Sequence, residues 1–523
     1  MAIRKSEGTV FITKRGEHLS MKQQGWLPVK GMVVASMLLT TLACSTAGTS
    51  SSGNPEGSAV KKEEKPLELT MAAVAYQEPP VDGNEIEKRI AAFTNTKLSI
   101  QWIPLAAYTD KINLMIASGE LPKVVNANYS PTIQSAMKSG MFWEIGPHLS
   151  KFKNLSTFNK AYFDHTVVDG KVYGIPSSRP ITRQSLIYRS DWLKNAGLKE
   201  PKNLEELYQV LKAYTQNDPD KNGVNDTVGL AMEGLGKLNN IVVMHGGPNK
   251  FAIESGKLIP DFETNEYMDV LKFMKRLYAE KLMNQDFAVA TRAQTQGSFT
   301  TGKSGMVQAV SGNAYNFYAV LVKPVPQAEV DYFTAFEEPK GRKVVAEINT
   351  ETLTLIPKSS VKTEEELLRI LAFFDKLAEP EMATLLARGI EGKHYKVEDG
   401  KALTTDGALF LKEVADLRNQ LLKTWIFHNT MPPKQHALLD KSDRSDKDDE
   451  KYGVFDASKT LTSATYMERG KELEQIITDA ATQFIMGKMD EAGFRKEIEK
   501  WRKTGGDKML DEFMADSNKK NKK

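Results

Sequence analysis

From residue 67 onward, short apolar segments alternate with helical ones, and this alternation limits the fold more than any other feature. Strand-like runs occur at 67–75 (LELTMAAVA), 98–102 (LSIQW) and 124–125. Between them, Asn84 stands where a helix N-cap is expected, and residues 110–118 have helical periodicity. Strands that alternate with helices through short loops predict an α/β fold built on a largely parallel sheet.

The rest of the chain is expected to be mostly helical. Helices are predicted at 204–214, 267–281, 363–378, 470–486 and 490–501, with a short strand at 227–231. Residues 441–451 (KSDRSDKDDEK) are so rich in charge that we expect a solvated loop there. The closing segment 516–523 is expected to be a disordered tail.

Composition excludes several classes of protein. The chain has 523 residues and a single cysteine, so a disulfide framework or a Cys-rich metal centre is excluded. The net charge of +3 comes from the first 43 residues, because the remainder carries 64 basic and 65 acidic residues. A nearly neutral body with mixed charges argues against nucleic acid as a partner. No organic cofactor is expected.

The sole cysteine, Cys44, directly follows an uncharged stretch of 13 residues at 31–43. Lys22 and Lys30 precede this stretch, and basic residues followed by a short apolar run are typical of a secretory signal. The stretch is too short to span a bilayer, which takes about 20 apolar residues. A Ser/Gly-rich linker follows the cysteine. Met21 is a second candidate for the initiating residue, and it would shorten the signal.

Five segments occur in an order that points to one family. They are 111–122 (KINLMIASGELP), 168–176 (VDGKVYGIP), 188–198 (YRSDWLKNAGL), 389–395 (GIEGKHY) and 501–506 (WRKTGG). This ordered set resembles the extracellular solute-binding proteins of bacterial ABC importers, family 1, in the lipoprotein branch linked to oligosaccharide uptake. Cys44 and its flanks likewise resemble a lipoprotein cleavage site, where the cysteine receives a diacylglyceryl group and becomes the acylated (palmitate-type) N-terminus. The alternative is an ordinary secretory signal with an incidental cysteine.

The resemblance implies an α/β, two-lobed periplasmic-binding-protein-like fold of type II, with hinge strands between the lobes and a ligand cleft. The implied parts are a signal at 1–43, a lipidated linker at 44–66, lobe 1 at 67–180 plus 347–400, and lobe 2 at 181–346 plus 401–515. It also implies a monomer, held by its lipid on the outer face of a Gram-positive cell membrane, that captures an oligosaccharide and delivers it to a permease. No enzymatic activity is expected.

Two alternatives remain. One is a peptide-binding or sensory lipoprotein with the same fold, because a fold does not determine its ligand. The other is a lipid-anchored surface glycosidase, whose chemistry needs two carboxylates about 5–10 Å apart.

Residues for sugar recognition are expected where strands end, because sugars present hydroxyls to planar polar groups and C–H faces to aromatic rings. Candidates of these types follow the predicted strands. They are Tyr76, Asn128, Tyr129, Arg179, Asn313, Tyr315 and Asn349.

A calcium-like loop runs from residue 218 to residue 226. Oxygen donors stand at positions 1, 3, 5 and 9 with a carbonyl at position 7, and Gly223 occupies position 6, where a sharp turn is needed. The donors are Asp218, Asp220, Asn222, the Val224 carbonyl and Asp226. The bidentate Glu of position 12 is missing, and Gly229 stands there. A structural Ca²⁺ is expected, and a metal-free Asp/Asn/Gly turn is the alternative.

Residues 297–304 (GSFTTGKS) match the letters of a phosphate-binding loop. That loop requires a buried strand before it and a helix after it. The preceding run, 290–296, is polar, so ATP binding is not expected.

Overall fold

The computed structural model describes residues 65–521 except positions 77, 159, 165, 338, 340, 348, 349, 422 and 424–428. The signal, Cys44 and the linker up to residue 64 lie outside the described residues. The described residues belong to one compact unit that starts at Glu64. None of the helices in this part of the chain combines the length and the apolar character that a membrane span requires.

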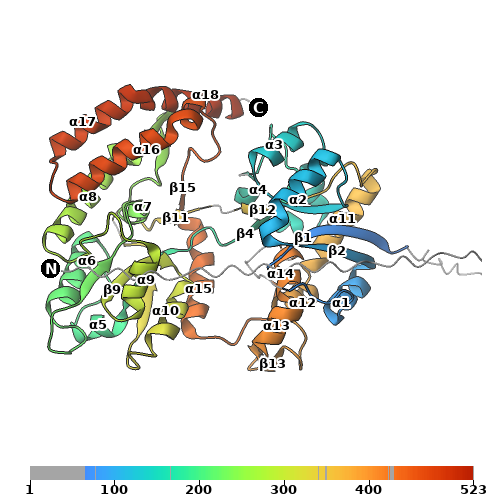
Figure 1. Ribbon diagram of the computed structural model, residues 1–523, viewed down its shortest axis with the longest axis horizontal. Helices are drawn as coiled ribbons and strands as arrows, with labels where there is room; N and C mark the ends of the chain where they lie inside the picture. The colour runs from blue at the N-terminus through green and yellow to red at the C-terminus, as the bar shows by residue number, and fades with distance from the viewer. Residues whose placement is uncertain are drawn as a thin grey trace, which may run out of the picture. The chain divides into compact units, whose positions relative to one another are not determined.

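The first sheet has five strands in the order β2-β1-β3-β12-β4 (Figure 1). The strands are β1 (Leu67–Ala75), β2 (Thr96–Pro104), β3 (Val124–Asn128), β4 (Gly174–Ser178) and β12 (Thr350–Leu355). β1 runs parallel to both β2 and β3, while β12 is antiparallel to β3 and β4. The predicted α/β class is confirmed.

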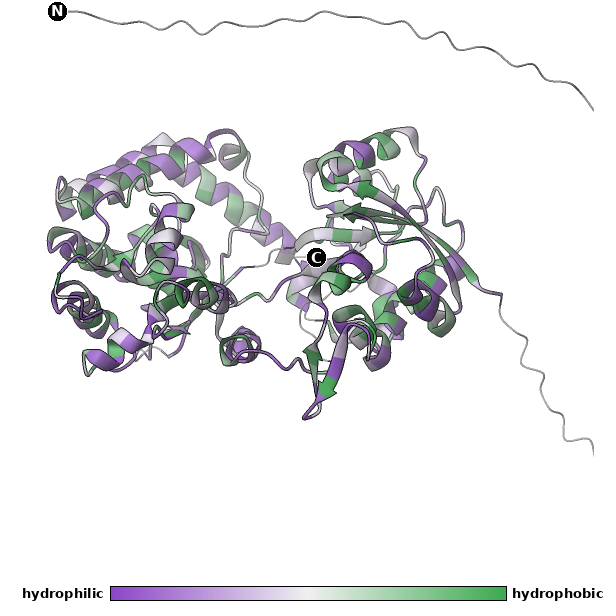
Figure 2. Ribbon diagram, turned by 60° about the horizontal axis from the view of Figure 1, so that its bottom comes forward, coloured by the Kyte–Doolittle hydropathy of each residue, from purple (hydrophilic) through white to green (hydrophobic). Residues whose placement is uncertain are grey.

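Side chains of β1 alternate between two apolar cores, as the twofold period of a strand requires. Leu69 and Met71 lie in the core on one face, and Ala72 and Val74 lie in the core on the other. The first face is covered by α1 (Glu85–Thr94), α11 (Glu364–Leu377), α12 (Pro380–Arg388) and α14 (Ala415–Leu421). The second face is covered by α2 (Leu105–Ser118) and α3 (Pro131–Lys138). In Figure 2 the strands of this sheet carry green segments between white and purple ones, because β2 at the edge has exposed polar residues.

The second sheet has four strands in the order β10-β5-β9-β6. They are β5 (Gln184–Arg189), β6 (Val228–Ala231), β9 (Ser304–Val310) and β10 (Val330–Phe333). β6 and β9 are parallel, so their carboxyl ends share one edge of the sheet. We call each sheet with its helices a lobe, the first built on β1 and the second on β9.

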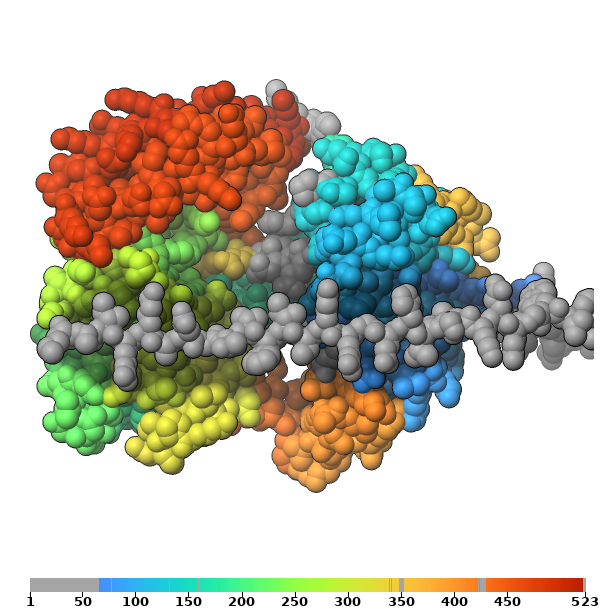
Figure 3. Space-filling view, viewed as in Figure 1, coloured from blue at the N-terminus to red at the C-terminus, as the bar shows by residue number. Residues whose placement is uncertain are grey.

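Helices cover both faces of the second sheet. One face carries α5 (Ser190–Asn195), α6 (Leu204–Gln216), α7 (Leu238–Met244), α8 (Asn265–Ala279), α16 (Ala464–Ile485) and α17 (Glu491–Trp501). The other face carries α9 (Arg292–Thr300), α10 (Asn313–Leu321) and α15 (Ala437–Asp448). The C-terminal helices, red in Figure 3, lie directly on the green residues of this lobe, and α16 packs on α8.

The chain passes between the two sheets three times: from β4 to β5, from β11 (Val344–Ala346) to β12, and from α14 to α15. β11 pairs in parallel with β15 (Gly453–Phe455). Asn249, only 3% exposed, donates hydrogen bonds to the carbonyls of both strands, at 3.2 Å to Ala346 and 2.9 Å to Val454. This one buried amide therefore ties both strands to the second lobe.

The boundary between the lobes differs from the predicted one. Residues 401–421, assigned from the sequence to lobe 2, pack in the first lobe. β14 (Lys401–Thr404) pairs with β13 (Tyr395–Glu398), and Leu417 and Leu421 are buried in the first core. The reason is that the apolar face of α14 fills space beside β1 and α12, which the sequence pattern alone does not reveal.

Two further expectations are corrected. Residues 441–451 form not a solvated loop but part of α15 and the 3₁₀ helix Asp449–Tyr452. Ser442 and Asp449 are buried there, because partners distant in sequence satisfy them. The tail expected to be disordered from residue 516 is helical as far as residue 521, within α18 (Asp507–Asn521).

Candidate functional site

Three of the predicted residues lie at the carboxyl ends of β1 and β3 in the first sheet. Ala72 is in parallel register with Val125, and Tyr76 and Tyr129 each stand four residues further along the two strands. Tyr76 is 48% exposed, Asn128 is exposed, and Tyr129 is half-buried, which raises its pKa. Aromatic and amide groups therefore lie at one edge of the first sheet. Asn349 lies outside the described residues.

A buried polar network lies beneath this edge, and sequence reasoning missed it. Asn126 donates to Gln420 Oε1 at 2.9 Å and accepts from Lys423 Nζ at 3.1 Å and from Thr354 Oγ1 at 2.6 Å. Burial of Lys423 lowers its pKa to about 7. The only sequence feature that pointed to this network was an asparagine inside an apolar strand. The network fixes the end of β3 against α14 and the chain that follows it.

A hollow of about 270 Å³ opens where the first crossing segment meets the carboxyl end of β9; we call it the Asp446 pocket. It is lined by Arg179, Pro180, Arg183, Val310, Ser311, Gly312, Asn313, Asn316 and Asp446. Two predicted residues, Arg179 and Asn313, are brought together here although 134 positions separate them. Arg183, Ser311 and Asp446 were missed, and Asp446 was hidden inside the charged run 441–451.

The carboxyl group of Asp446 accepts a hydrogen bond from one serine hydroxyl, which a second serine supports. Ser311 Oγ donates to Asp446 Oδ1 at 2.7 Å, and Ser442 Oγ donates to Ser311 Oγ at 2.9 Å. Burial raises the pKa of Asp446 to about 7. With two guanidinium groups, two amides and this carboxyl, the pocket is equipped for a ligand rich in hydroxyl or carboxylate groups.

Beside this pocket, Tyr315 belongs to a group of three rings. The ring centroids of Tyr315 and His436 lie 5.2 Å apart, and those of Tyr318 and His436 lie 4.8 Å apart. His436 caps α15 by accepting from the backbone N–H of Leu438 at 3.2 Å. Both tyrosines are half-buried and His436 is exposed, so ring surface remains open to solvent.

The loop after β6 adds charge to the same edge of the second sheet. Glu233 forms ion pairs with Lys237 at 2.8 Å and with Arg292 at 3.4 Å. Lys237 and Gln308 exchange hydrogen bonds, Lys237 Nζ to the Gln308 carbonyl and Gln308 Nε2 to the Lys237 carbonyl, at 3.1 and 3.0 Å. Lys237 and Gln308 join the loop that follows β6 to strand β9, and the sequence analysis did not select them.

A sequence profile of the bacterial extracellular solute-binding proteins matches residues 78–384, more than half of the chain. The chain belongs to this family. Lipoprotein LipO of Bacillus subtilis (strain 168) is 34% identical over 511 residues, covering 94% of this solute-binding protein and 97% of LipO. The polygalacturonan/rhamnogalacturonan-binding protein YtcQ of the same strain is 36% identical over 499 residues, covering 92% and 98%. The family binds solutes without catalysis, so the chain is not an enzyme.

Solved structures share the fold of this solute-binding protein. An HMO-binding, ABC-transporter-associated solute-binding protein from Bifidobacterium longum infantis superposes with a TM-score of 0.64 at 17% identity, covering 86% of this chain and 98% of that one. The N-glycan transport protein NgtS from Streptococcus pneumoniae gives 0.60 at 17%, covering 87% and 100%. The predicted two-lobed solute-binding fold is confirmed.

Two further solved structures of similar fold were studied with respect to calcium or an EF-hand. The alginate-binding protein AlgQ2, solved without calcium ion, has a TM-score of 0.53 at 18% identity, covering 87% of this chain and 98% of that one. An EF-hand mutant of S. pneumoniae FusA has 0.56 at 17%, covering 87% and 100%.

The calcium-like loop of this solute-binding protein is closed by its own side chains. Asp218 accepts hydrogen bonds from the backbone N–H groups of Asn222 at 3.0 Å and Gly223 at 2.9 Å. Gly223 has φ +84°, the turn that its position requires. Asn222 Nδ2 donates to Asp220 at 2.9 Å and to Asp226 at 3.5 Å. Three of the predicted donors, Asp218, Asp220 and Asp226, thus accept hydrogen bonds from a fourth, Asn222.

Two observations bear on whether this loop fits Ca²⁺. Asp220 Oδ1 is buried and has no hydrogen-bond partner among the described residues. The pKa of Asp220 is raised, mainly by burial and also by the neighbouring Asp218. Lys303, however, pairs with Asp226 at 2.6 Å and lowers the pKa of that carboxyl. In the part of the chain that the structure describes, no group of three or more His, Cys, Asp or Glu side chains is arranged to hold a metal. Carboxylate and amide oxygens are the donor types that Ca²⁺ takes, but here they are bonded to one another's N–H groups and to Lys303.

The segment that matches a phosphate-binding loop has the wrong context. Gly297 lies inside α9, which Thr291 and Gln294 start with a capping box, and β9 begins only at Ser304. The order is helix, turn, strand, the reverse of what phosphate binding requires.

Proposed function

We propose that this protein is the lipid-anchored extracellular component of an ABC importer, and that it captures an oligosaccharide between its lobes and delivers it to a permease. Similarity to LipO and YtcQ over nearly their whole lengths supports the role, and the name of YtcQ supports a carbohydrate ligand. The ABC-transporter association of the structurally similar Bifidobacterium protein supports an importer.

The observation that carries the proposal is the chemistry of the two carboxyl edges. The first lobe offers Tyr76, Asn128 and Tyr129, and the second offers Arg179 and Asn313 in one hollow. Aromatic faces stack on the C–H faces of sugar rings, while guanidinium and amide groups bind hydroxyls and carboxylates. Closure of two lobes around a ligand is a known mode of such proteins. Arg179 and Arg183 favour a sugar that carries carboxylates.

Calorimetric titration of residues 45–523 tests the ligand class. The panel contains oligogalacturonides, neutral fructooligosaccharides and short peptides. One oligosaccharide bound unchanged per chain supports the proposal, and tighter binding of oligogalacturonides supports an acidic sugar. Binding of peptides alone would replace the proposal with a peptide-binding lipoprotein of the same fold.

We further propose that Cys44 is acylated and anchors the protein, as a monomer, to the outer face of a Gram-positive cell membrane. The uncharged stretch before Cys44 and the lipoprotein name of LipO support this. The variant Cys44→Ser is expected to appear in the culture medium, while the wild type partitions with the membrane fraction. Membrane retention of Cys44→Ser would show that another segment holds the chain.

Finally, we propose that the 218–226 loop binds Ca²⁺ through Asp218, Asp220, Asn222, the Val224 carbonyl and Asp226. Hard oxygen donors at this spacing and the partnerless buried oxygen of Asp220 support it. The ion would brace the loop between α6 and β6 and take no part in ligand chemistry.

A further inference from the structure

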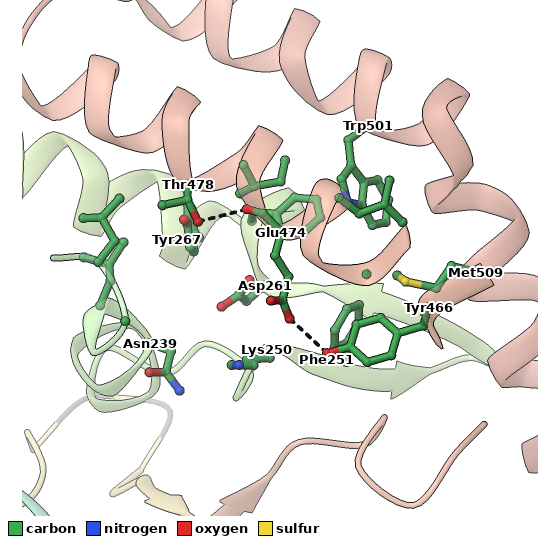
Figure 4. Close-up of a pocket in the computed structure, with 17 residues that line it drawn as sticks. Asn239, Lys250, Phe251, Asp261, Tyr267, Tyr466, Glu474, Thr478, Trp501 and Met509 are labelled. Atoms are coloured by element: carbon green, nitrogen blue, oxygen red, sulfur yellow. Dashed lines mark hydrogen bonds between the residues drawn. The ribbon is translucent and has the colours of Figure 1, made fainter. Parts of the chain in front are cut away.

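A second hollow, of about 250 Å³, lies within the second lobe between α16 and the hairpin of β7 (Phe251–Glu254) and β8 (Lys257–Pro260). We call it the Asp261 pocket. Its lining includes Asp261, Glu474, Lys250, Tyr466, Tyr267 and Trp501 (Figure 4). An apolar cavity of about 150 Å³ is known to hold benzene, so this pocket has room for a ring with a short arm.

The walls of the Asp261 pocket are aromatic and firmly packed. Trp501 is 2% exposed and meets Phe262 edge to face, with ring centroids 4.9 Å apart. Tyr466 lies at the mouth, 41% exposed, with its ring 5.7 Å from that of Phe513. These rings are held by neighbours on several helices, so the pocket persists without a ligand and can receive a flat apolar group.

Two carboxyl groups face this apolar space. Asp261 is 8% exposed, and its carboxyl group accepts a hydrogen bond from the backbone N–H of Phe262. Glu474 accepts a hydrogen bond of 2.9 Å from the Tyr466 hydroxyl, which fixes its position (Figure 4). A buried carboxyl with a backbone donor still has free acceptor positions, where a ligand's donor would be stabilised.

The charge around Asp261 is acidic on balance. The titratable groups that face it are Lys250, Glu474, Asp456 and Tyr267. Lys250 is the one cation among the residues that line the pocket, and it is exposed at the rim. Burial raises the Asp261 pKa to about 7, so an ammonium group that enters favours its ionised form.

We propose that the Asp261 pocket binds a small primary amine, with a ring seated against Trp501 and Tyr466 and an ammonium group hydrogen-bonded to Asp261 and Glu474. Aromatic faces attract cations, and charge-assisted hydrogen bonds to carboxylates are the strong ones. The ring can be that of an aryl-alkyl amine or of an amino sugar, because both place an ammonium beside an apolar face. This site goes beyond the proposed function and does not depend on it.

The test is calorimetric titration of residues 45–523 with two amines and their neutral counterparts. The probes are 2-phenylethylamine with 2-phenylethanol, and glucosamine with glucose. We expect at least one amine to bind about tenfold or more tightly than its neutral counterpart, since hydrogen bonds between charged groups are worth that much. The pair that shows the difference tells whether the ligand is an aryl-alkyl amine or an amino sugar. Equal binding of amine and alcohol, or no binding of either amine, overturns the proposal.

Substitutions in the pocket and at a control position distinguish amine binding in the Asp261 pocket from binding elsewhere on the protein. Asp261→Asn is expected to lose about tenfold or more in amine affinity. Lys250→Met is expected to gain affinity, because a like charge is removed from the rim. The control Asp479→Asn alters an exposed carboxyl on α16 that does not line the pocket and is expected to bind normally. If Asp261→Asn does not fold, Glu474→Gln takes its place, and unchanged affinity in the folded variant overturns the proposal.

A pH series gives an independent readout. The affinity for 2-phenylethylamine is expected to rise from about pH 6 to pH 8 as Asp261 ionises, because its alkylammonium group keeps its proton over this range. An affinity that falls over this interval contradicts the assigned carboxyl.

Discussion

Ser311 donates a 2.7 Å hydrogen bond to Asp446, a residue 135 positions later in the chain. Ser311 follows β9 in the second sheet, and Asp446 lies on α15, which the chain reaches only after its third passage between the lobes. The bond therefore brings a late helix to the carboxyl edge of the second sheet. It also completes the hollow that contains Arg179 and Asn313.

Arg179→Ala and Asn313→Ala are expected to weaken oligosaccharide binding by about tenfold or more each. The reason is that each removes a polar group from the Asp446 pocket, and hydrogen bonds to charged groups contribute about 1.5–3 kcal/mol. Calorimetric titration with the best oligosaccharide measures the loss. Arg495→Ala, which removes an exposed guanidinium on α17, is the matched control. Wild-type affinity in both pocket variants would place the ligand elsewhere.

Asp446→Asn is expected to stabilise the protein above pH 7 and to have little effect near pH 4. Burial raises the Asp446 pKa from 3.8 to about 7, so the folded state holds a proton that the unfolded state releases between these values. The free energy of unfolding of the wild type therefore falls as pH rises through this window, and the asparagine removes that loss. A pKa change from 3.8 to about 7 makes the gain on the order of 4 kcal/mol once Asp446 is fully ionised.

Urea unfolding of both proteins at pH 4, 5, 6 and 8 measures this difference. Asp448→Asn, on the exposed side of α15, is the control and should show no such trend. A constant difference across pH would mean that Asp446 does not hold its proton in the folded state.

Calcium is expected to raise the melting temperature of the protein. An ion that binds the folded state alone stabilises it by about 2.7 kcal/mol at a hundredfold excess over its dissociation constant. Asp220→Asn should abolish the rise, because it removes the buried carboxylate oxygen that lacks a partner. Lys303→Met should strengthen binding, because it frees Asp226 from its ion pair. Scanning calorimetry with Ca²⁺ and with chelator decides, and identical curves would favour the metal-free turn.

Two glycine-to-alanine changes are expected to act in opposite directions. A Cβ at Gly305 would lie 2.1 Å from Tyr214 Cδ2, so Gly305→Ala should lower the free energy of unfolding by about 1–3 kcal/mol. Gly297 sits in α9 with nothing within 4 Å of a Cβ, so Gly297→Ala should raise it by up to about 1 kcal/mol. Urea unfolding measures both. A destabilised Gly297→Ala would indicate a role that the helix does not explain.

Interactions between residues close together in the sequence were sufficient to predict the regular helices and strands. Asn84 caps α1, as predicted, by accepting from the Glu87 N–H at 3.0 Å. Thr363, the first residue of the helix predicted at 363–378, caps α11 by accepting from the Glu366 N–H at 3.2 Å. The strand at 67–75 has the predicted bounds. Such features depend on neighbours within four residues, so they are visible in the sequence.

The candidate site was only partly predictable. Arg179, Asn313 and Tyr129 follow strands, and the rule that ligands meet strand ends selected them. Glu233, Lys237 and Arg183 obey the same rule but carry no distinctive pattern. The rings of the Asp261 pocket come from two stretches, residues 251–267 and 466–501, which are 199 positions apart at their nearest.

The sequence by itself determined that this is an α/β solute-binding protein with a signal-like N-terminus, because hydrophobic periodicity, caps and ordered motifs are local properties. Tertiary structure decided that α14 belongs to the first lobe and that the charged run 441–451 is a half-buried helix. Apolar residues at helical spacing can pack on either sheet, and Asp446 and Asp449 accept burial only because Ser311, Thr334 and Arg342 reach them from distant segments. Burial of charge depends on partners in space, and the order of residues along the chain does not state which partners will meet.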